Sequence, residues 1–238
     1  MLVAAAVCPC PPLLVPEVAA GAAPEMSTAR DACAEVLGVL AAARPDRLVV
    51  VGPAERDGRH PQGSRGSFRG FGVDLDVRLG RGGTTDPAPS QATLPASLAV
   101  AARLLDRVGW ADTPVEGLGV GGSRSVERCV QAGRDIAGSA ERVALLVMGD
   151  GSACRTLKAP GYLDDRAVGF DAEIARALAA VDIAALQALD AGLARELQAS
   201  GRAPWQVLAG AAESATLGGS LLYDDAPYGV GYLVAVWS

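Results

Sequence analysis

The sequence predicts an α/β fold in which a mostly parallel central sheet is flanked by helices on both faces. Apolar runs of strand length alternate with segments whose apolar residues recur at helical spacing. The runs are nearly continuous in Val and Leu, as in strands that are buried on both faces. No repeat, linker or shift in composition divides the chain, so we expect a single domain over residues 1–238.

Three apolar runs and one weaker candidate account for the expected parallel strands. They lie at residues 2–7, 47–52, 142–148 and, for the weaker candidate, 115–119. Residues 220–237 alternate between apolar and polar side chains around a central turn, which predicts a C-terminal strand pair. We expect this pair to close the sheet.

Helical segments lie between the strands and after them. Their apolar residues fall on one helical face, as in helices that cover a sheet. We expect these helices at about residues 24–43, 91–108, 124–138 and 166–199. This alternation of strand and helix implies parallel strands joined by crossovers.

The segment 53–70 breaks the pattern because it is polar and rich in glycine. Loops of this length without internal structure are often mobile or functional, and we expect such a loop here. It carries His60, the only histidine of the chain, which we expect on the surface. A single histidine excludes a metal site built from two or three imidazoles.

The composition narrows the classes of partner. The chain has 27 acidic and 21 basic residues, and its basic residues are scattered, which argues against duplex nucleic acid or an anionic membrane surface. No apolar run approaches the length of a membrane helix, and the N-terminal run lacks the basic start of a signal peptide. We therefore expect a cytoplasmic protein that binds a small molecule or a protein partner, with a homo-oligomer left open.

Candidate functional residues lie in the loops that follow the predicted strands. In an open α/β sheet, ligands bind beyond the carboxyl ends of the strands. Loops at residues 8–12, 53–57 and 149–158 should therefore converge on one crevice. The last loop holds Lys158, the only lysine among 21 basic residues, and an ammonium there suits a close contact or proton transfer. A chance lysine on a solvated loop is the alternative.

The residues predicted to act in this crevice come mainly from these three loops. The candidate catalytic residues are Cys10, Asp150, Cys154 and Lys158. The candidate ligand-binding residues are Cys8, Glu55, Ser152, Arg155 and Trp205. Positive charge from Lys158 and Arg155 beside a Gly-rich turn would favour the thiolate of a nearby cysteine.

The five cysteines allow two interpretations, because a cytosolic protein rarely holds disulfides. Cys8 and Cys10, joined by Cys154, would form a soft-metal site for Cu(I) or Zn(II), or a redox pair. Alternatively they are ordinary buried thiols, which is the expectation for Cys33 and Cys129 on apolar helix faces.

Four segments resemble the catalytic-subunit fold of class III extradiol ring-cleavage dioxygenases, the LigB-type superfamily that includes the Memo-like proteins. They are the Pro-rich turn after the first strand, RPDRLVVVGP at 44–53, MGDGSACR at 148–155 and WQVLAGAA at 205–212. The resemblance implies a LigB-like α/β domain with a crevice at the strand ends. Working members bind non-haem Fe(II) there through two His and a Glu, and cleave a catechol ring with O₂ with help from a further His.

Matched position by position, the resemblance implies that this machinery is missing here. The two ligand histidines fall at Cys10 and Ala54, and the acid/base histidine falls at Ala153. The carboxylate ligand falls at one of residues 201–203, none of which is acidic. We therefore expect no Fe(II) cofactor and no ring cleavage.

Three functions remain open from the sequence. The first is binding of a small molecule or a partner in the dioxygenase-type crevice, without a cofactor. The second is a refitted, oxidoreductase-like enzyme that uses the Cys, Asp and Lys side chains of the crevice, either with Cu(I) or Zn(II) or without metal. The third is a non-catalytic assembly subunit. All three are arguments from fold resemblance, and each needs the geometry of the site.

Overall fold

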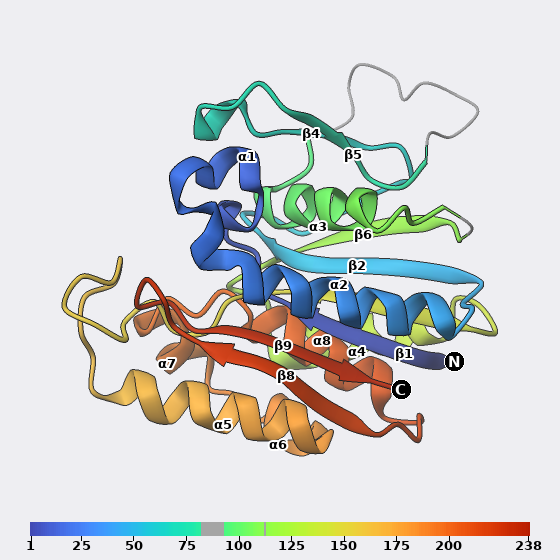
Figure 1. Cartoon of the computed structure of the whole chain (residues 1–238). Helices are drawn as coiled ribbons and strands as arrows, with labels where there is room; N and C mark the ends of the chain where they lie inside the picture. The colour runs from blue at the N-terminus through green and yellow to red at the C-terminus, as the bar shows by residue number, and fades with distance from the viewer. Residues whose placement is uncertain (82–92, 112) are drawn as a thin grey trace.

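A seven-stranded mixed sheet forms the centre of the computed structural model, which describes residues 1–81, 93–111 and 113–238 (Figure 1). The strand order is β3-β6-β2-β7-β1-β9-β8. The strands are β1 (Leu2–Cys8), β2 (Arg47–Ala54), β3 (Gly58–His60), β6 (Val115–Gly121), β7 (Val143–Met148), β8 (Gly219–Asp225) and β9 (Tyr232–Trp237). A small second sheet pairs β4 (Arg65–Ser67) with β5 (Asp76–Arg78).

The four central strands run parallel and the edges run antiparallel. β7 lies between β1 and β2, and β2 also pairs with β6, all in parallel. On one side β9 adds antiparallel to β1 and β8 to β9, while β3 adds antiparallel to β6 on the other. The α/β class and the C-terminal strand pair are thus confirmed, and the parallel part of the sheet is its centre.

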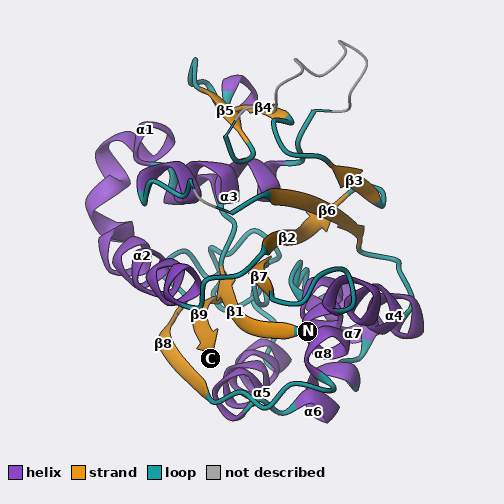
Figure 2. Cartoon of the chain, turned by 90° about the vertical axis from the view of Figure 1, so that its right-hand side faces the viewer, coloured by secondary structure: helices purple, strands orange, loops and turns teal. Residues whose placement is uncertain are grey.

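Helices cover both faces of the sheet, as Figure 2 shows for α2 and α3 on one side and α4 and α8 on the other. The α-helices are α1 (Pro16–Ala19), α2 (Ser27–Ala42), α3 (Ala96–Arg107), α4 (Val126–Ala137), α5 (Arg166–Ala180), α6 (Ile183–Gln187), α7 (Ala191–Glu196) and α8 (Arg202–Ala212). Short 3₁₀ helices are η1 (Pro12–Leu14), η2 (Ala20–Met26) and η3 (Arg69–Phe71). None of the helices in the described ranges is long and apolar enough to span a bilayer.

The long helix expected at 166–199 is three helices. Val181 has a left-handed backbone with φ of 54°, which ends α5. The Asp182 carboxylate then caps α6 by accepting the Ala185 N–H, and Asp190 caps α7 in the same way. These breaks turn the chain back toward the ends of the strands. The first two residues of the helix expected at 91–108 lie outside the described residues.

The helix α8 is buried along its whole length and lies close against α4. A Cβ at Gly133 of α4 would collide with the Val207 carbonyl, and one at Gly210 of α8 would collide with the Val130 carbonyl. The two glycines therefore allow the helix backbones to touch. This contact holds the first turn of α8 at the carboxyl edge of the sheet.

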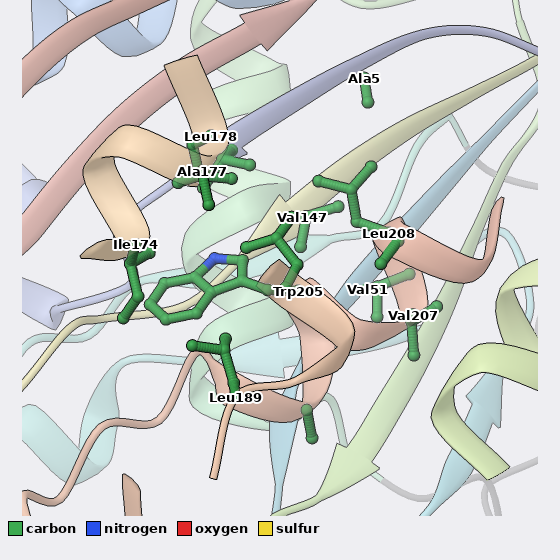
Figure 3. Close-up of a cluster of buried hydrophobic side chains, with 14 of the residues drawn as sticks. Ala5, Val51, Val147, Ile174, Ala177, Leu178, Leu189, Trp205, Val207 and Leu208 are labelled. Carbon is green, nitrogen blue, oxygen red and sulfur yellow. The ribbon is translucent and has the colours of Figure 1, made fainter. Parts of the chain in front are cut away.

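Trp205 anchors α8 in the core beneath the sheet. Figure 3 shows its indole among side chains from several elements, including Val147 of β7 and Ile174 and Leu178 of α5. The side chain is fully buried. Trp205 was expected as a ligand-binding residue, but the structure makes it a packing residue, because its ring lies between helices and sheet.

Candidate functional site

A cavity of about 1210 Å³ opens beyond the carboxyl ends of β1 and β2. Its wall combines Cys10 after β1, the β2–β3 segment 53–60, the start of α3 at 95–97, and residues of α7 and of the turn into α8. This is where open α/β sheets bind ligands, and the volume is large enough for a small organic molecule. Two of the three loops expected here, 8–12 and 53–57, do line the cavity, and Glu55 is among the lining residues.

The third loop, 149–158, does not line the cavity. Its residue Asp150 instead supports the cavity wall from behind, through hydrogen bonds. The Cys10 N–H donates to Asp150 Oδ1 at 2.8 Å, and the Cys10 thiol donates to Oδ2 at 3.7 Å. The Asp150 N–H donates in turn to Oγ of Ser200 at 3.0 Å. Cys10 and Ser200 both line the cavity. The ends of β1 and β7 and the α7–α8 turn are therefore joined beneath its floor.

Burial sets the protonation states of Asp150 and of the two groups near it, Cys10 and Tyr232, which we call the floor of the cavity. It raises the pKa of Asp150 to about 6, against the opposing hydrogen bonds from Cys10. Burial also raises the pKa of the Cys10 thiol well above its ordinary value, and the Asp150 charge adds to the shift. The pKa of Tyr232 is raised by burial and then by Asp150. At neutral pH the floor thus holds a carboxylate beside a neutral thiol and a neutral phenol.

The Cys154 thiol is not the activated group that the sequence suggested. Its Sγ donates toward the carbonyls of Gly161 and Leu197, each at 3.5 Å. Burial raises the Cys154 pKa, and the charges of Asp164 and Asp171 raise it further. The expectation of a favoured thiolate is therefore wrong, because burial, and after it the charges of the two carboxylates, favours the neutral thiol. Lys158 lies exposed on the same loop.

Ser152 and Arg155 also belong to a structural network rather than to the cavity wall. The Ser152 N–H and hydroxyl donate to the two oxygens of Asp171, both at 2.7 Å. Arg155 donates to Asp171 Oδ2 at 3.1 Å. Asp171 is only 1% exposed, so these three donors satisfy a buried carboxylate on α5. The loop at 151–158 is thereby drawn toward α5 and away from the cavity.

The three cysteines of the proposed soft-metal site lie apart. Cys8 points to the face covered by α2, where the Cys33 thiol is its hydrogen-bond partner and, with burial, raises its pKa. Cys10 lines the cavity and Cys154 packs in the opposite core. Within the described ranges, no three His, Cys, Asp or Glu side chains lie close enough together to hold a metal ion.

His60 differs most from its expectation. It is 8% exposed, lies in β3 opposite Gly117 of β6, and lines the cavity. A Cβ at Gly117 would lie 3.1 Å from the Cβ of His60, so the glycine makes room for the imidazole. Burial lowers the His60 pKa, which leaves the ring neutral at pH 7. The segment 53–70 is therefore not an unstructured loop: it contains β3, β4 and the first two residues of η3.

Sequence reasoning missed the polar side chains that reach the cavity from helices. Ser97 lies in the first turn of α3 and donates to the Pro53 carbonyl at 2.7 Å. Arg195 comes from α7 and Arg202 from the start of α8, and Gln198 adds from the turn between them. The signal for Arg202 was present, since it is one of the three positions matched with the family's carboxylate ligand. The other side chains carried no local motif.

Comparison with known proteins is informative for the fold. No protein-family model and no curated protein sequence matches the chain. Among solved structures, it resembles the uncharacterized protein JW3007 from Escherichia coli K12, with a TM-score of 0.59 and 15% sequence identity. The match covers 99% of both chains, so the two proteins share the whole fold.

Proposed function

We propose that this chain is a divergent member of the LigB-type superfamily that binds a small molecule in the cavity without Fe(II)-dependent ring cleavage. One observation carries the proposal: the positions matched with the two ligand histidines, Cys10 and Ala54, line the same cavity as 202 and 203, two of the three positions matched with the carboxylate ligand. These positions lie in three distant parts of the sequence. Because these positions lie on one cavity, they support the match with the family's iron ligands. They also support the view that the crevice is kept although the iron ligands are missing.

The residues at the positions matched with the family's ligands do not fit an iron site, and the His, Cys, Asp and Glu side chains of the described residues form no other group that could hold a metal ion. Cys10 is a neutral thiol bound to Asp150, and Ala54 offers a methyl group. Arg202 brings a positive charge to the region where the family has a carboxylate. Non-haem Fe(II) takes imidazole and carboxylate ligands, so we derive no step that uses the metal.

Two measurements test the proposal together. Anaerobic loading with Fe(II), metal analysis and a colour assay on catechols should give neither stoichiometric iron nor turnover. A small-molecule screen by thermal shift should find compounds that stabilise the wild-type protein but not Ala54→Trp, whose indole would project into the cavity and narrow it. Stoichiometric iron with ring cleavage overturns the proposal, as does a screen in which Ala54→Trp responds like the wild type.

A second candidate function, a metal-free enzyme that transfers protons at the cavity floor, is favoured by Asp150. Its carboxyl group has a pKa of about 6 and is hydrogen-bonded to Cys10, which faces the cavity. A carboxyl that titrates near neutral pH is suited to general acid/base work. Turnover of a bound compound that is lost in Asp150→Asn, with binding retained, would favour the enzyme. Binding without any turnover would leave the first proposal.

A further inference from the structure

Arg202 is a buried cation without an acidic partner. Its side chain belongs to the first turn of α8, and the residue is 3% exposed. Nη1 donates to the Arg124 carbonyl at 2.9 Å and to Oε1 of Gln206 at 2.8 Å, and Nη2 donates to the Gly122 carbonyl. In the part of the chain that the structure describes, no Asp or Glu forms an ion pair with Arg202.

These contacts use three of the five N–H donors of Arg202 and leave its charge uncompensated. Carbonyl and amide oxygens are neutral acceptors, and a buried charge without a counter-charge is costly. Arg202 lines the cavity. The cavity is therefore the place from which a ligand can supply the missing negative charge.

Three further arginines line the same cavity from different elements. Arg56 lies in the β2–β3 turn, Arg59 in β3 and Arg195 in α7, and all three are exposed. None of the three side chains has an ion-pair or hydrogen-bond partner among the described residues. By contrast, Arg124 beside the cavity is paired with Asp57.

The acidic side chains of the wall do not balance these cations. Asp57 is engaged by Arg124 and by the Gly121 N–H, at 2.8 Å. Glu55 is the one other carboxylate of the wall within the described ranges. The chain as a whole carries a net charge of −6, so the excess of guanidinium groups here is a local feature.

We propose that the cavity binds an anionic small molecule, a carboxylate or a phosphate monoester, whose charge lies near Arg202 and is approached by Arg56 and Arg195. This inference rests on the proposed function and names its ligand class. Guanidinium groups suit these anions because their N–H donors match two oxygens at once. Small apolar side chains of the wall, such as Ala194 and Ala199, leave room for the neutral body of the ligand.

Three probes of similar shape isolate the charge: benzoate, phenyl phosphate and the neutral benzamide. Calorimetric titration of the full chain at neutral pH should show benzoate or phenyl phosphate binding about tenfold or more tightly than benzamide, since a charged hydrogen bond contributes that much. The better anion decides between carboxylate and phosphate. Arg195→Gln and Arg56→Gln should each weaken that anion several-fold and leave benzamide unchanged.

Matched variants keep the test interpretable. Arg128→Gln removes an exposed arginine of α4 that does not line the cavity, and it should leave all three affinities unchanged. Arg202→Lys keeps the charge and should keep the preference for anions, whereas Arg202→Gln should lose it. Thermal unfolding of each variant checks that the fold persists, and the variants of the exposed Arg56 and Arg195 carry the test if Arg202→Gln does not fold.

The outcomes separate this inference from the proposed function. Equal affinity for all three probes, lost in Ala54→Trp, overturns the inference and supports a cavity for neutral molecules. No binding of either anion also overturns it, and the thermal-shift screen then decides the proposed function on its own. Anion binding that Arg128→Gln weakens as much as Arg195→Gln would show general attraction to the surface, and would overturn the inference as well.

Discussion

The thiol of Cys10 donates to Oδ2 of Asp150 at 3.7 Å across 140 residues of sequence. Cys10 follows β1 and Asp150 follows β7, the parallel neighbour of β1, so this bond joins the two strand ends beneath the cavity. The Cys10 N–H holds the other carboxylate oxygen. A change at Asp150 therefore tests the geometry and the electrostatics of the floor together.

Asp150→Asn should change how the free energy of unfolding depends on pH. Burial raises the pKa of Asp150 from 3.8 to about 6 in the folded protein, so the native state binds this proton more tightly than the unfolded chain. The resulting stabilisation is complete below about pH 4 and is lost as the pH rises through about 6. Across this window the wild type should lose on the order of 1–3 kcal/mol relative to Asp150→Asn, measured by urea denaturation.

Asp164→Asn is a control of opposite sign for this titration. Hydrogen bonds from Arg166 hold the pKa of Asp164 at about 2, below its ordinary value of 3.8. Its stabilisation is present above the ordinary pKa and is lost as the pH falls toward 2, so Asp164→Asn should cost stability only at the higher pH. If Asp150→Asn shifts stability equally at both ends of its window, the raised pKa of Asp150 is refuted.

Iodoacetamide should label all five cysteines slowly in the native protein at neutral pH. All five are buried, and the pKa values of Cys8, Cys10, Cys129 and Cys154 are raised, chiefly by burial or by a neighbouring thiol. Thiols in such surroundings are inert because the thiolate is the reactive form. Mass-spectrometric labelling against pH should give the same profile for Cys154 in Lys158→Ala. Fast labelling of Cys154 that depends on Lys158 would contradict this prediction and support the hypothesis of a refitted, oxidoreductase-like enzyme.

Trp205→Ala should destabilise the fold by about 3–5 kcal/mol, because it leaves a cavity between α5, α8 and the sheet. The ring is fully buried among apolar side chains. Leu157, which is 62% exposed, provides the matched control, and Leu157→Ala should change stability by about 0.5 kcal/mol or less. Urea denaturation measures both. Similar effects of the two substitutions would contradict the packing role of Trp205.

The central strands could be predicted because the burial of each one is evident from its own apolar residues. The runs at 2–7, 47–52 and 142–148 are apolar apart from Arg47 and Arg142 at their starts, and they became β1, β2 and β7 with ends shifted by two residues or fewer. The helix α8 escaped prediction for a related reason. It is buried on all sides, so no polar face marks its period.

Prediction of the site depended on contacts between distant residues. Cys10 could be placed at the cavity because it directly follows a strand. His60 could not, since its burial depends on the space that Gly117 leaves in a strand far along the chain. Likewise, the loop after Asp150 turns toward α5 because the Asp171 carboxylate accepts hydrogen bonds from Ser152 and Arg155. Nothing in the loop itself predicts that contact.

The most direct test of the account follows the amide resonances of ¹⁵N-labelled protein during titration with benzoate. Binding in the cavity should shift the resonances of Cys10, Ala54, Ser200 and Arg202, which come from three distant segments of the sequence and line one cavity. The resonances of the Ser152 amide, which donates to Asp171, and of the Arg155 amide, which donates to the Gly229 carbonyl, should stay in place. Saturable shifts that include these four residues, with none at Ser152 and Arg155, are the predicted result. Shifts centred on 152–155, or saturable shifts that leave Cys10 and Arg202 unmoved, would contradict it.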